Sequence, residues 1–398
     1  MKVCFYTNFE VSPQKGGTER ITHSVSEILT EHYGVKCYSI YSNTISKELK
    51  RSTFEKKIKI CYQDDFTQKV KNFIIENDLN IIIIQGDFTV SRKFREAINM
   101  SQSHCKLIFV HHFNPGAEVN FKTVRPIIDK ICNQQDLFKN FIKLLLFPLL
   151  KYQYVKRLPK MYKQTYENVD KVVLLSSYFI NDFAKYAKLT DSSKIAVINN
   201  MLSFDEYFDM NLYERCKKNN VLIVSRLEEK QKRISLALKI WSLIEKKQKL
   251  SDWNLLIVGD GRDALRYKKF VQKHNLKRVQ FEGVQNPVAY YKQSSLFMLT
   301  SSFEGWGLTL TEAQQFGCVP LAFDTYASLK DIIDNDKNGI IVKENDVYSY
   351  ASQLESLMLN EVKRKCMASF AIEYSKRLAP NIIGEKWYDL FNDITTVP

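Results

Sequence analysis

The chain has 398 residues, 45% hydrophobic and 26% charged, so it is long enough for two hydrophobic cores and is neither disordered nor collagen-like in composition. Its formal net charge of +14 predicts an anionic partner, a requirement that nucleic acid, anionic lipid and phosphorylated small molecules all meet. The eight cysteines form no Cys-x-x-Cys pair, which favours a reducing, cytoplasmic compartment over a disulfide framework. No apolar stretch is long enough to span a bilayer, and we expect no signal peptide because a strand follows Met1 directly.

Short apolar runs alternate with helical stretches along the whole chain. In the first half, the predicted strands are Lys2–Thr7, Val35–Ser42, Ile81–Gln85, Leu107–Val110, Lys171–Leu175 and Ile195–Ile198. The helices between them include Glu19–Glu31, Phe66–Glu76 and a long basic segment from about Arg125 to Tyr166. In the second half, the predicted strands are Val221–Ser225, Asn254–Val258, Val279–Glu282, Leu296–Thr300 and Val319–Phe323. Such alternation predicts parallel sheets covered by helices on both faces.

The polar stretch Asp205–Asn220 separates the two halves and is predicted to be a linker. We therefore expect domains at 1–204 and 205–375, followed by a C-terminal helix at 376–398. Ligands would bind at the carboxyl ends of both sheets, in the cleft between two facing domains.

Two carboxylates, Glu304 and Glu312, lie on either side of a glycine turn that follows the strand Leu296–Thr300. A strand, a glycine turn and a helix N-terminus form an anion site, because backbone N–H groups face the ligand. Flanking carboxylates suit hydroxyl groups better than phosphate. The pattern therefore predicts a nucleotide sugar, with Glu304 on the sugar and Glu312 on the ribose. The alternative is an ordinary capping carboxylate at a helix entry.

A second group is basic. Arg226 follows the strand Val221–Ser225, and Lys232 is expected to open the next helix, Ile234–Ile244, so both side chains could enter one cleft. Arginine binds phosphate oxygens as a fork and lysine as a point charge. In so basic a chain, a solvated basic turn is the competing interpretation.

The sequence from Gly259 to Ala264 matches the dinucleotide fingerprint Gly-x-Gly-x-x-Ala, and Glu282 lies where a ribose-binding acid would be. An NAD-dependent oxidoreductase is therefore the rival hypothesis. We favour the nucleotide sugar because this motif is frequent by chance and lies in the middle of a domain. It also leaves the paired carboxylates and the basic pair unexplained.

In the first half, Gly16 and Gly17 follow the first strand and would let backbone approach a ligand closely. His111 follows the strand Leu107–Val110, where it could donate a hydrogen bond to a sugar or carry a proton. We prefer it to its neighbour His112. A structural imidazole with satisfied hydrogen bonds is the alternative.

A possible metal pair, Asp334-Asn-Asp336, is followed by Lys337-Asn-Gly339, which favours a polar turn. We expect no metal and no cofactor.

The segment 139–163 contains seven Lys or Arg and no Asp or Glu, interleaved with apolar residues, and Pro148 and Pro159 are predicted to break it into short pieces. This composition suits the surface of an anionic bilayer. Alternatively, its apolar face covers the sheet of the first domain.

Together these residues resemble the family-four retaining glycosyltransferases of GT-B fold. The resemblance covers most of the chain and is strongest from Val221 to Val342. Its motifs are Ser225-Arg-Leu with Gln231-Lys-Arg, Val258-Gly-Asp-Gly261, Phe281-Glu-Gly283, Glu304-Gly-Trp-Gly-Leu with Glu312-Ala, Gly317-Cys-Val-Pro320 and Asn338-Gly339. Gly16-Gly17, His111 and Ile198-Asn199-Asn200 stand where the family has equivalents, whereas Trp306 and Ser225 depart from its pattern.

The resemblance implies an α/β fold of two facing Rossmann-like, doubly wound parallel-sheet domains, with a C-terminal helix returning to the first. It implies a metal-independent hexosyltransferase. This enzyme would move a sugar from a UDP- or GDP-sugar to a glycan or lipid-linked acceptor, with retention, in capsule, O-antigen or lipopolysaccharide assembly.

The resemblance also implies roles for single residues. Arg226 and Lys232 would bind the donor diphosphate, and the backbone of Gly307 and Leu308 its distal phosphate. Glu304 and His111 would hold the sugar from opposite domains, and Glu312 the ribose. Gly16 and Gly17 would close over the diphosphate. The remaining substrate-binding positions are Asn199, Gly259 and Gly305.

Two further alternatives remain. A nucleotide-sugar epimerase or hydrolase of the same fold could use the same donor pocket, and it would process its substrate with no acceptor present. A nucleic-acid binder would explain the charge but not the paired carboxylates, and it lacks a recognisable binding module. We therefore expect no nucleic acid, and a cytoplasmic enzyme with peripheral membrane contact as an added option.

Overall fold

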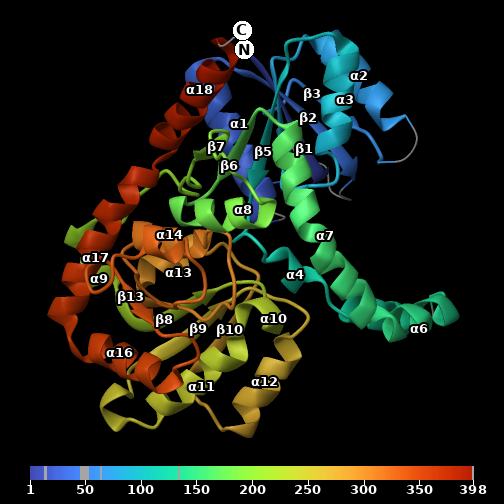
Figure 1. The fold of residues 1–398 in the computed structure, drawn as a ribbon. Coiled ribbons are helices and arrows are strands. Elements are labelled where there is room, and N and C mark those ends of the chain that lie inside the picture. Colours follow the sequence, from blue (N-terminus) through green and yellow to red (C-terminus); the bar gives the residue numbers. More distant parts are fainter. Residues whose placement is uncertain (13–15, 45–52, 63–64, 133–134, 397–398) are drawn as a thin grey trace. The chain divides into compact units, whose positions relative to one another are not determined.

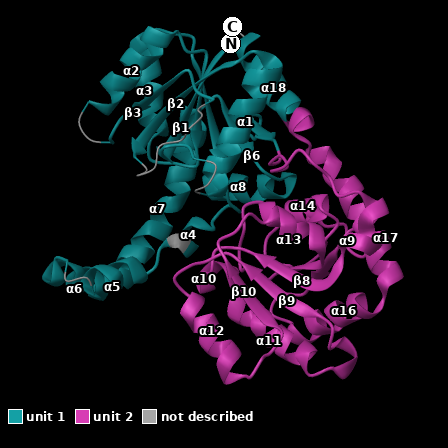
Figure 2. Ribbon diagram, turned by 180° about the vertical axis from the view of Figure 1, so that it is seen from behind, with its two compact units in different colours: residues 1–198, 384–398 teal, residues 199–383 magenta. Residues whose placement is uncertain are grey.

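The computed structural model describes residues 1–12, 16–44, 53–62, 65–132 and 135–396. They form two compact units (Figures 1 and 2): unit 1 comprises Met1–Ile198 with Gly384–Pro398, and unit 2 comprises Asn199–Ile383. The predicted divisions fall after residues 204 and 375, whereas these units divide after Ile198 and Ile383.

Unit 1 is built on a seven-stranded parallel sheet in the order β3-β2-β1-β4-β5-β6-β7. Its strands are β1 Lys2–Phe9, β2 Lys36–Asn43, β3 Lys56–Lys59, β4 Ile81–Gln85, β5 Lys106–His111, β6 Lys171–Leu174 and β7 Ile195–Val197. All five residues of β4, four of them isoleucine, are buried. A β-branched run without alternation is typical of a parallel strand covered on both faces.

The helices of unit 1 are α1 Gly17–Tyr33, α2 Phe66–Asn77, α3 Ser91–Ser101, α4 Glu118–Phe121, α5 Arg125–Cys132, α6 Leu137–Leu145, α7 Phe147–Asn168 and α8 Ile180–Ala187, with a 3₁₀ turn at Ser177–Phe179. In α1, Ile21, Val25 and Leu29 recur every four residues and are buried, which gives the helix its apolar stripe. Helix α18, Pro380–Thr396, ends in this unit, where Tyr388 stacks on Tyr33 with ring centroids 4.6 Å apart.

Helix α7 continues through Pro159, so the prediction that this proline breaks the segment is wrong. Leu158 and Tyr162, on either side of it, are fully buried. Their packing outweighs the hydrogen bond that the proline removes. Pro148, in contrast, lies in the first turn of α7, where a missing N–H costs little.

Unit 2 contains a six-stranded parallel sheet in the order β10-β9-β8-β11-β12-β13. The strands are β8 Lys218–Val224, β9 Asn254–Val258, β10 Val279–Gly283, β11 Ser294–Leu299, β12 Val319–Phe323 and β13 Ile340–Val342. The helices are α9 Tyr213–Cys216, α10 Glu229–Lys232, α11 Ile234–Glu245, α12 Ala264–Lys273, α13 Val288–Gln293, α14 Leu308–Gln315, α15 Leu329–Ile332, α16 Val347–Leu359 and α17 Glu361–Ser375. Short 3₁₀ turns occupy Met210–Leu212, Gln248–Leu250 and Lys376–Leu378.

The predicted fold class, two doubly wound parallel-sheet units, is confirmed. The short strands β3 and β13 were not predicted. In β3, three of four residues are lysine, a composition that carries no strand signal and suits an exposed sheet edge.

The predicted linker Asp205–Asn220 is wrong, because this segment contains α9 and the first residues of β8. Phe208 and Tyr213 are buried within unit 2. The ammonium group of Lys217 donates hydrogen bonds of 2.7 to 2.9 Å to the carbonyl oxygens of Tyr291, Ser294 and Phe316. Burial lowers the pKa of Lys217. The polar composition of this segment is therefore misleading, because its apolar residues and the ammonium group of Lys217 are held in the core of unit 2.

Candidate functional site

The strand order of unit 2 reverses between β8 and β11, which pair in parallel. In doubly wound sheets, ligands bind at the carboxyl edge at such a reversal, because the connecting helices leave in opposite directions there. Arg226 follows β8, and Glu304 lies in the loop after β11. The two chemically distinctive loops of the sequence therefore meet at the switch point of this sheet.

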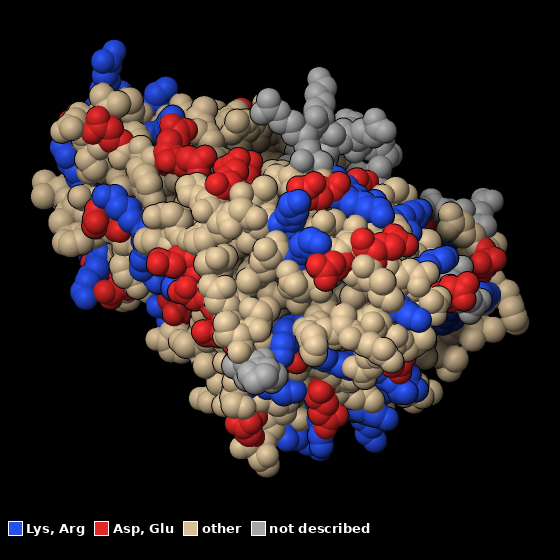
Figure 3. Space-filling view, turned by 90° about the horizontal axis from the view of Figure 1, so that it is seen from above, with Lys and Arg blue, Asp and Glu red and all other residues tan. Residues whose placement is uncertain are grey.

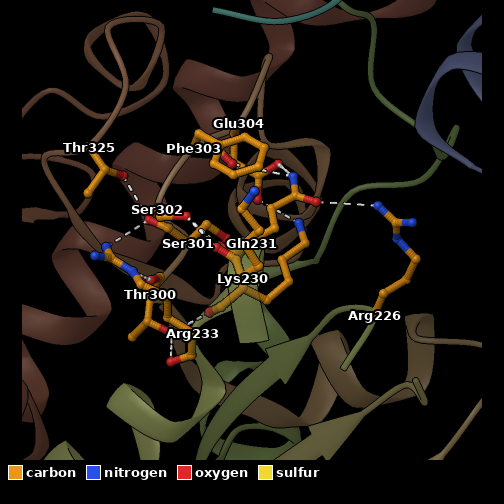
Figure 4. Close-up of polar contacts among 11 residues, drawn as sticks. Arg226, Lys230, Gln231, Arg233, Thr300, Ser301, Ser302, Phe303, Glu304 and Thr325 are labelled. Carbon is orange, nitrogen blue, oxygen red and sulfur yellow. Dashed lines mark hydrogen bonds and ion pairs between the residues drawn. The ribbon is translucent and has the colours of Figure 1, made fainter. Parts of the chain in front are cut away.

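Side chains of these loops form one network (Figure 4). The Lys232 Nζ atom lies 2.5 Å from Glu304 Oε1. Gln231 Nε2 donates to Glu304 Oε2 at 3.3 Å, and Arg226 Nη2 donates to Gln231 Oε1 at 3.3 Å. The Lys232 and Glu304 side chains are 14% and 10% exposed, whereas the Arg226 side chain is 65% exposed. An inner ion pair is thus linked through Gln231 to an outer, accessible guanidinium group.

Hydrogen bonds to backbone carbonyl oxygens hold the two loops together. Arg233, at a left-handed φ of 49° between α10 and α11, donates from its guanidinium group to the carbonyl oxygens of Thr300 and Ser301. Ser302 N donates to Gln231 O at 2.7 Å (Figure 4). Lys232 closes the short helix α10, so the prediction that it opens the following helix is wrong. Its side chain is nonetheless fixed, because α10 is fastened to the end of β11.

The turn from Glu304 to Gly307 leads into α14. Gly307 has a φ of 92°, and a Cβ atom there would lie 2.9 Å from the Tyr326 hydroxyl oxygen, so only glycine fits without strain. Ser328 Oγ donates to the carbonyl oxygen of Gly305 at 2.9 Å. Leu308 begins α14, whose first turn presents backbone N–H groups that can bind an anion.

Two buried donors lie at this turn. Trp306 is 2% exposed and Tyr326 is 4% exposed. Among the described residues, Trp306 Nε1 and the Tyr326 hydroxyl group have no hydrogen-bond partner. Burial, followed by the negative charge of Glu304, raises the pKa of Tyr326 well above its usual value, so its proton stays in place. Buried donors are normally satisfied, and a ligand bound at this turn would supply acceptors.

Gly259 and Gly261 serve a close approach between backbones. Gly259 has a φ of 129°, and a Cβ atom there would lie 2.0 Å from the carbonyl oxygen of Ser225. A Cβ atom on Gly261 would lie 2.6 to 2.9 Å from the backbone of Leu227. Both glycines therefore let the loop after β9 pack on the loop that carries Arg226. This contact accounts for the Gly-x-Gly pattern without a bound dinucleotide.

Glu312 lies outside the network described for Arg226, Lys232 and Glu304. It is 1% exposed on α14, and its Oε2 atom accepts a hydrogen bond of 2.8 Å from the hydroxyl group of Tyr291. Its predicted contact with a ribose stays a prediction, and in this arrangement the carboxylate is covered.

In unit 1, Gly16 precedes α1 as its N-cap and Gly17 is its first residue. His111 ends β5 and is 1% exposed. Its Nε2 atom lies 2.6 Å from Glu118 Oε1, and the Tyr162 hydroxyl group donates to the same oxygen at 2.9 Å. His111 therefore has a satisfied Nε2 atom, as the structural alternative required. Its Nδ1 atom is buried without a partner among the described residues, so a role toward the sugar stays a prediction.

His111 affects the pKa values of two neighbouring side chains, Glu118 and His112. Burial by itself would raise the pKa of Glu118, but the hydrogen bond from His111 and the charge of that ring outweigh it, and the pKa is lowered. The neighbouring His112 lies 2.5 Å from Gln85 Oε1, and burial followed by the charge of His111 lowers its pKa to about 3. His112 thus stays neutral, and the preference for His111 as the functional histidine of the pair stays a prediction.

Asn199 is the first residue of unit 2 and is half-buried. In the described ranges, no three His, Cys, Asp or Glu side chains are grouped so as to hold a metal ion. The segment from Asp334 to Gly339 forms a turn, in which Asp334 N donates to Asn338 Oδ1 at 2.8 Å and Asp336 N donates to the carbonyl oxygen of Gly339 at 2.9 Å.

Three residues of these sites carried no role in the sequence analysis: Gln231, Tyr326 and Glu118. Gln231 was visible only as the first residue of the motif Gln231-Lys-Arg, with no role of its own. Glu118 stands seven positions after His111, a spacing without periodic meaning in a loop. Tyr326 lies beyond the next strand, β12, so only the folded chain brings it to Gly307.

Residues 209–374 match the family model described as "Glycosyl transferases group 1". The amylovoran biosynthesis glycosyltransferase AmsD of Erwinia amylovora is 28% identical over 232 residues, 57% of this chain and 63% of that protein. An uncharacterized glycosyltransferase of Haemophilus influenzae is 25% identical over 348 residues, 87% of each chain. The chain thus spans less than two thirds of the first of these relatives.

A solved structure has the same fold over nearly the full length. HepE of Anabaena, in complex with UDP, superimposes with a TM-score of 0.72 at 15% identity, covering 99% of this chain and all of that one. At this identity the likeness shows the fold alone.

Proposed function

Because most of unit 2 matches the group 1 glycosyl transferases and its network lies within the matched residues, we propose that this protein is a glycosyltransferase. It moves a sugar from a nucleotide diphosphate sugar to an acceptor hydroxyl group. The observation that carries the proposal is the Arg226–Gln231–Glu304–Lys232 network at the switch point of the unit 2 sheet, next to the start of α14.

The network supplies what the leaving group requires. When the bond between sugar and diphosphate breaks, negative charge develops on the phosphate oxygens. The Lys232 ammonium group, the Arg226 guanidinium group and the N–H groups of Leu308 and Thr309 stabilise that charge. Such preorganised groups contribute roughly 10²–10³ in rate, about 3–4 kcal/mol.

The ion pair with Glu304 fixes Lys232 before the donor arrives. Its 2.5 Å contact and low exposure orient the ammonium group, which reduces the reorganisation needed during the reaction. In this proposal Glu304 also accepts hydrogen bonds from the hydroxyl groups of the donor sugar. Trp306 Nε1 and the Tyr326 hydroxyl group donate to oxygen atoms of the donor.

We further propose retention of configuration, as in family four. Glu304 is held by Lys232 and Gln231, which leaves it poorly placed to attack the sugar as a nucleophile. Front-face attack by the acceptor hydroxyl group, with a phosphate oxygen of the leaving group taking its proton, needs no protein nucleophile. The network that stabilises the phosphate is then sufficient, and no metal is required of it.

The donor is a UDP- or GDP-sugar, and the UDP bound by HepE, a protein of the same fold, makes UDP-sugars the first to test. The acceptor is a glycan or a lipid-linked glycan in capsule, O-antigen or lipopolysaccharide assembly, and AmsD, the relative named for amylovoran biosynthesis, supports an assembly pathway of this kind. The eight cysteines are unpaired, which favours the cytoplasm.

Thermal-shift screening of the full chain against UDP- and GDP-sugars tests donor binding, with Lys232→Met and the exposed-site control Lys246→Met in parallel. We expect stabilisation by one nucleotide class, lost in Lys232→Met and kept in the control. Nuclear magnetic resonance of the product then reports its anomeric configuration.

The alternatives give different results. An epimerase or hydrolase consumes the donor at full rate without acceptor. An NAD-dependent oxidoreductase is stabilised by NAD and not by nucleotide sugars. Donor binding that is indifferent to Lys232 would remove the network from the proposal.

A further inference from the structure

A helical arm extends from unit 1. It consists of α5, α6 and the first half of α7, residues 125–132 and 135–157. Figures 1 and 2 both show α6 at the end of α7 that points away from the unit 1 sheet. The second half of α7 is anchored, with Leu158 and Tyr162 fully buried. The exposed and anchored halves of one helix therefore meet near Leu158.

The arm presents apolar side chains to solvent. Of the 25 exposed large hydrophobic residues in the described part of the chain, ten lie between positions 137 and 155. Phe138 is 82% exposed, Leu145 is 76% exposed, and Phe141, Leu149 and Tyr152 each exceed half. Phe138, Phe141 and Leu145 recur at intervals of three or four residues along α6, and Leu149 and Tyr152 are three residues apart at the start of α7, so the two helices together carry an apolar stripe. The interpretation that the apolar face of the segment 139–163 covers the sheet of unit 1 is therefore wrong for these exposed residues, whereas Leu158 and Tyr162 at the end of the segment are buried in the unit.

The arm carries seven Lys or Arg and two acidic residues, Asp129 and Asp136. Residues 139–163 contain seven Lys or Arg and no Asp or Glu. Lys139, Lys143, Lys156 and Arg157 are exposed and lie in the same stretch as the apolar stripe. Figure 3, by contrast, shows a face on which basic and acidic residues are interspersed. The segment 139–163 thus contributes +7 to the protein's net charge of +14.

The combination of exposed apolar residues and positive charge fits one kind of binding partner. The core of a protein interface is depleted in lysine, and two copies of the arm packed on each other would bring like charges together. An anionic bilayer accepts both features, since aromatic and leucine side chains enter the acyl boundary while lysines contact lipid phosphates. No helix in the described ranges is both long and apolar enough to cross the bilayer.

We propose that the arm is a peripheral membrane anchor that inserts its apolar stripe into the interface of an anionic bilayer. Docking of this kind needs neither donor nor acceptor. The anchor rests on the proposed function in one respect only: a lipid-linked acceptor would lie at the same membrane surface.

Flotation of the full chain with phosphatidylglycerol-rich or pure phosphatidylcholine vesicles tests the anchor. The stripe variant is Phe138→Gln/Leu145→Gln, with Tyr348→Gln/Val362→Gln as its control, at residues 78% and 81% exposed in unit 2. The charge variant is Lys139→Glu/Lys143→Glu, with Lys246→Glu/Lys273→Glu as its control. All eight side chains are exposed, so these variants are expected to fold.

We expect the unaltered chain to bind only phosphatidylglycerol-rich vesicles. Each basic residue at an anionic surface contributes about fivefold in partitioning, so the charge variant should lose at least tenfold. The stripe variant should lose a similar factor, and both controls should keep most of their binding. Donor-induced thermal shifts should be unchanged in both arm variants, so loss of docking is distinguishable from failure of the proposed reaction.

Three results would overturn the anchor. One is no binding to either vesicle, and another is binding that the arm variants do not change. The third is light scattering that shows a dimer converted to a monomer by Phe138→Gln/Leu145→Gln, because the stripe would then be a contact between copies of the chain.

Discussion

One set of variants at the Lys232–Glu304 ion pair separates its contribution to the free energy of unfolding from its contribution to turnover. Its atoms lie 2.5 Å apart, and its side chains are 14% and 10% exposed. At an effective dielectric constant of about 20, unit charges about 4 Å apart attract by about 4 kcal/mol, and desolvation offsets part of this. We expect Lys232→Met to lower the free energy of unfolding by about 2 kcal/mol, because it leaves the Glu304 charge partly buried with Gln231 as its remaining donor.

Glu304→Gln should cost a similar amount, because it leaves the ammonium group of Lys232 unpaired. In the double variant Lys232→Met/Glu304→Gln no charge remains, so at least half of the lost stability should return. Turnover should not return. We expect kcat to fall at least tenfold in all three variants, since the cation that stabilises the phosphate or the carboxylate that positions it is gone.

Urea unfolding followed by tryptophan fluorescence measures the stability term, since Trp241, Trp253 and Trp306 lie in unit 2. Donor-to-acceptor transfer measures kcat, and Lys246→Met is the control for both. Additive losses of stability in the double variant would show that the pair is not coupled. Turnover at the unaltered rate in the double variant would remove both residues from the mechanism.

Three further predictions concern the surroundings of the sites. Arg226→Ala should leave the melting temperature unchanged, because the side chain is 65% exposed, and should weaken donor binding about tenfold by calorimetry; unchanged affinity would place the diphosphate elsewhere. Gly259→Ala should destabilise the protein by about 3 kcal/mol or more in thermal unfolding, because the new Cβ atom would lie 2.0 Å from a backbone oxygen. Gly283→Ala should cost only about 1 kcal/mol, because Gly283 has a φ of 69° but no atom lies within 4 Å of its Cβ position. Equal costs would contradict the close approach at Gly259. The pKa of His112 is lowered to about 3 in the folded chain. As the pH falls below about 6.5, the unfolded chain therefore takes up a proton that the folded chain does not. The free energy of unfolding should consequently drop by about 1 kcal/mol per pH unit below pH 6. His112→Gln should flatten the melting temperature between pH 6.5 and 5, and an unaltered slope would assign the effect to another group.

Much of unit 2 could be predicted because its signals are local. Fully buried runs such as those of β11 and β12 identify strands wherever they occur. Arg226, Lys232 and Glu304 follow or border such strands, and parallel topology brings those ends to one edge of the sheet. The prediction of a linker at Asp205–Asn220 is wrong for the opposite reason, because the contacts that fix this segment are not local. The apolar contacts of Phe208 and Tyr213 and the carbonyl partners of Lys217 come from residues far along the chain.

Sequence alone determined the alternation of strands and helices, the two doubly wound units and the loops that carry the charged residues, because each depends on patterns within a few consecutive positions. Only tertiary structure decided that Gln231 joins Arg226 to Glu304, that Tyr326 lines the turn at Gly307, and that Glu118 holds His111. It also decided that the stripe from Phe138 to Tyr152 is exposed, since periodicity shows that a helix has an apolar face but not what covers it. These outcomes depend on which distant segments share a surface, and that is settled by packing of the whole domain.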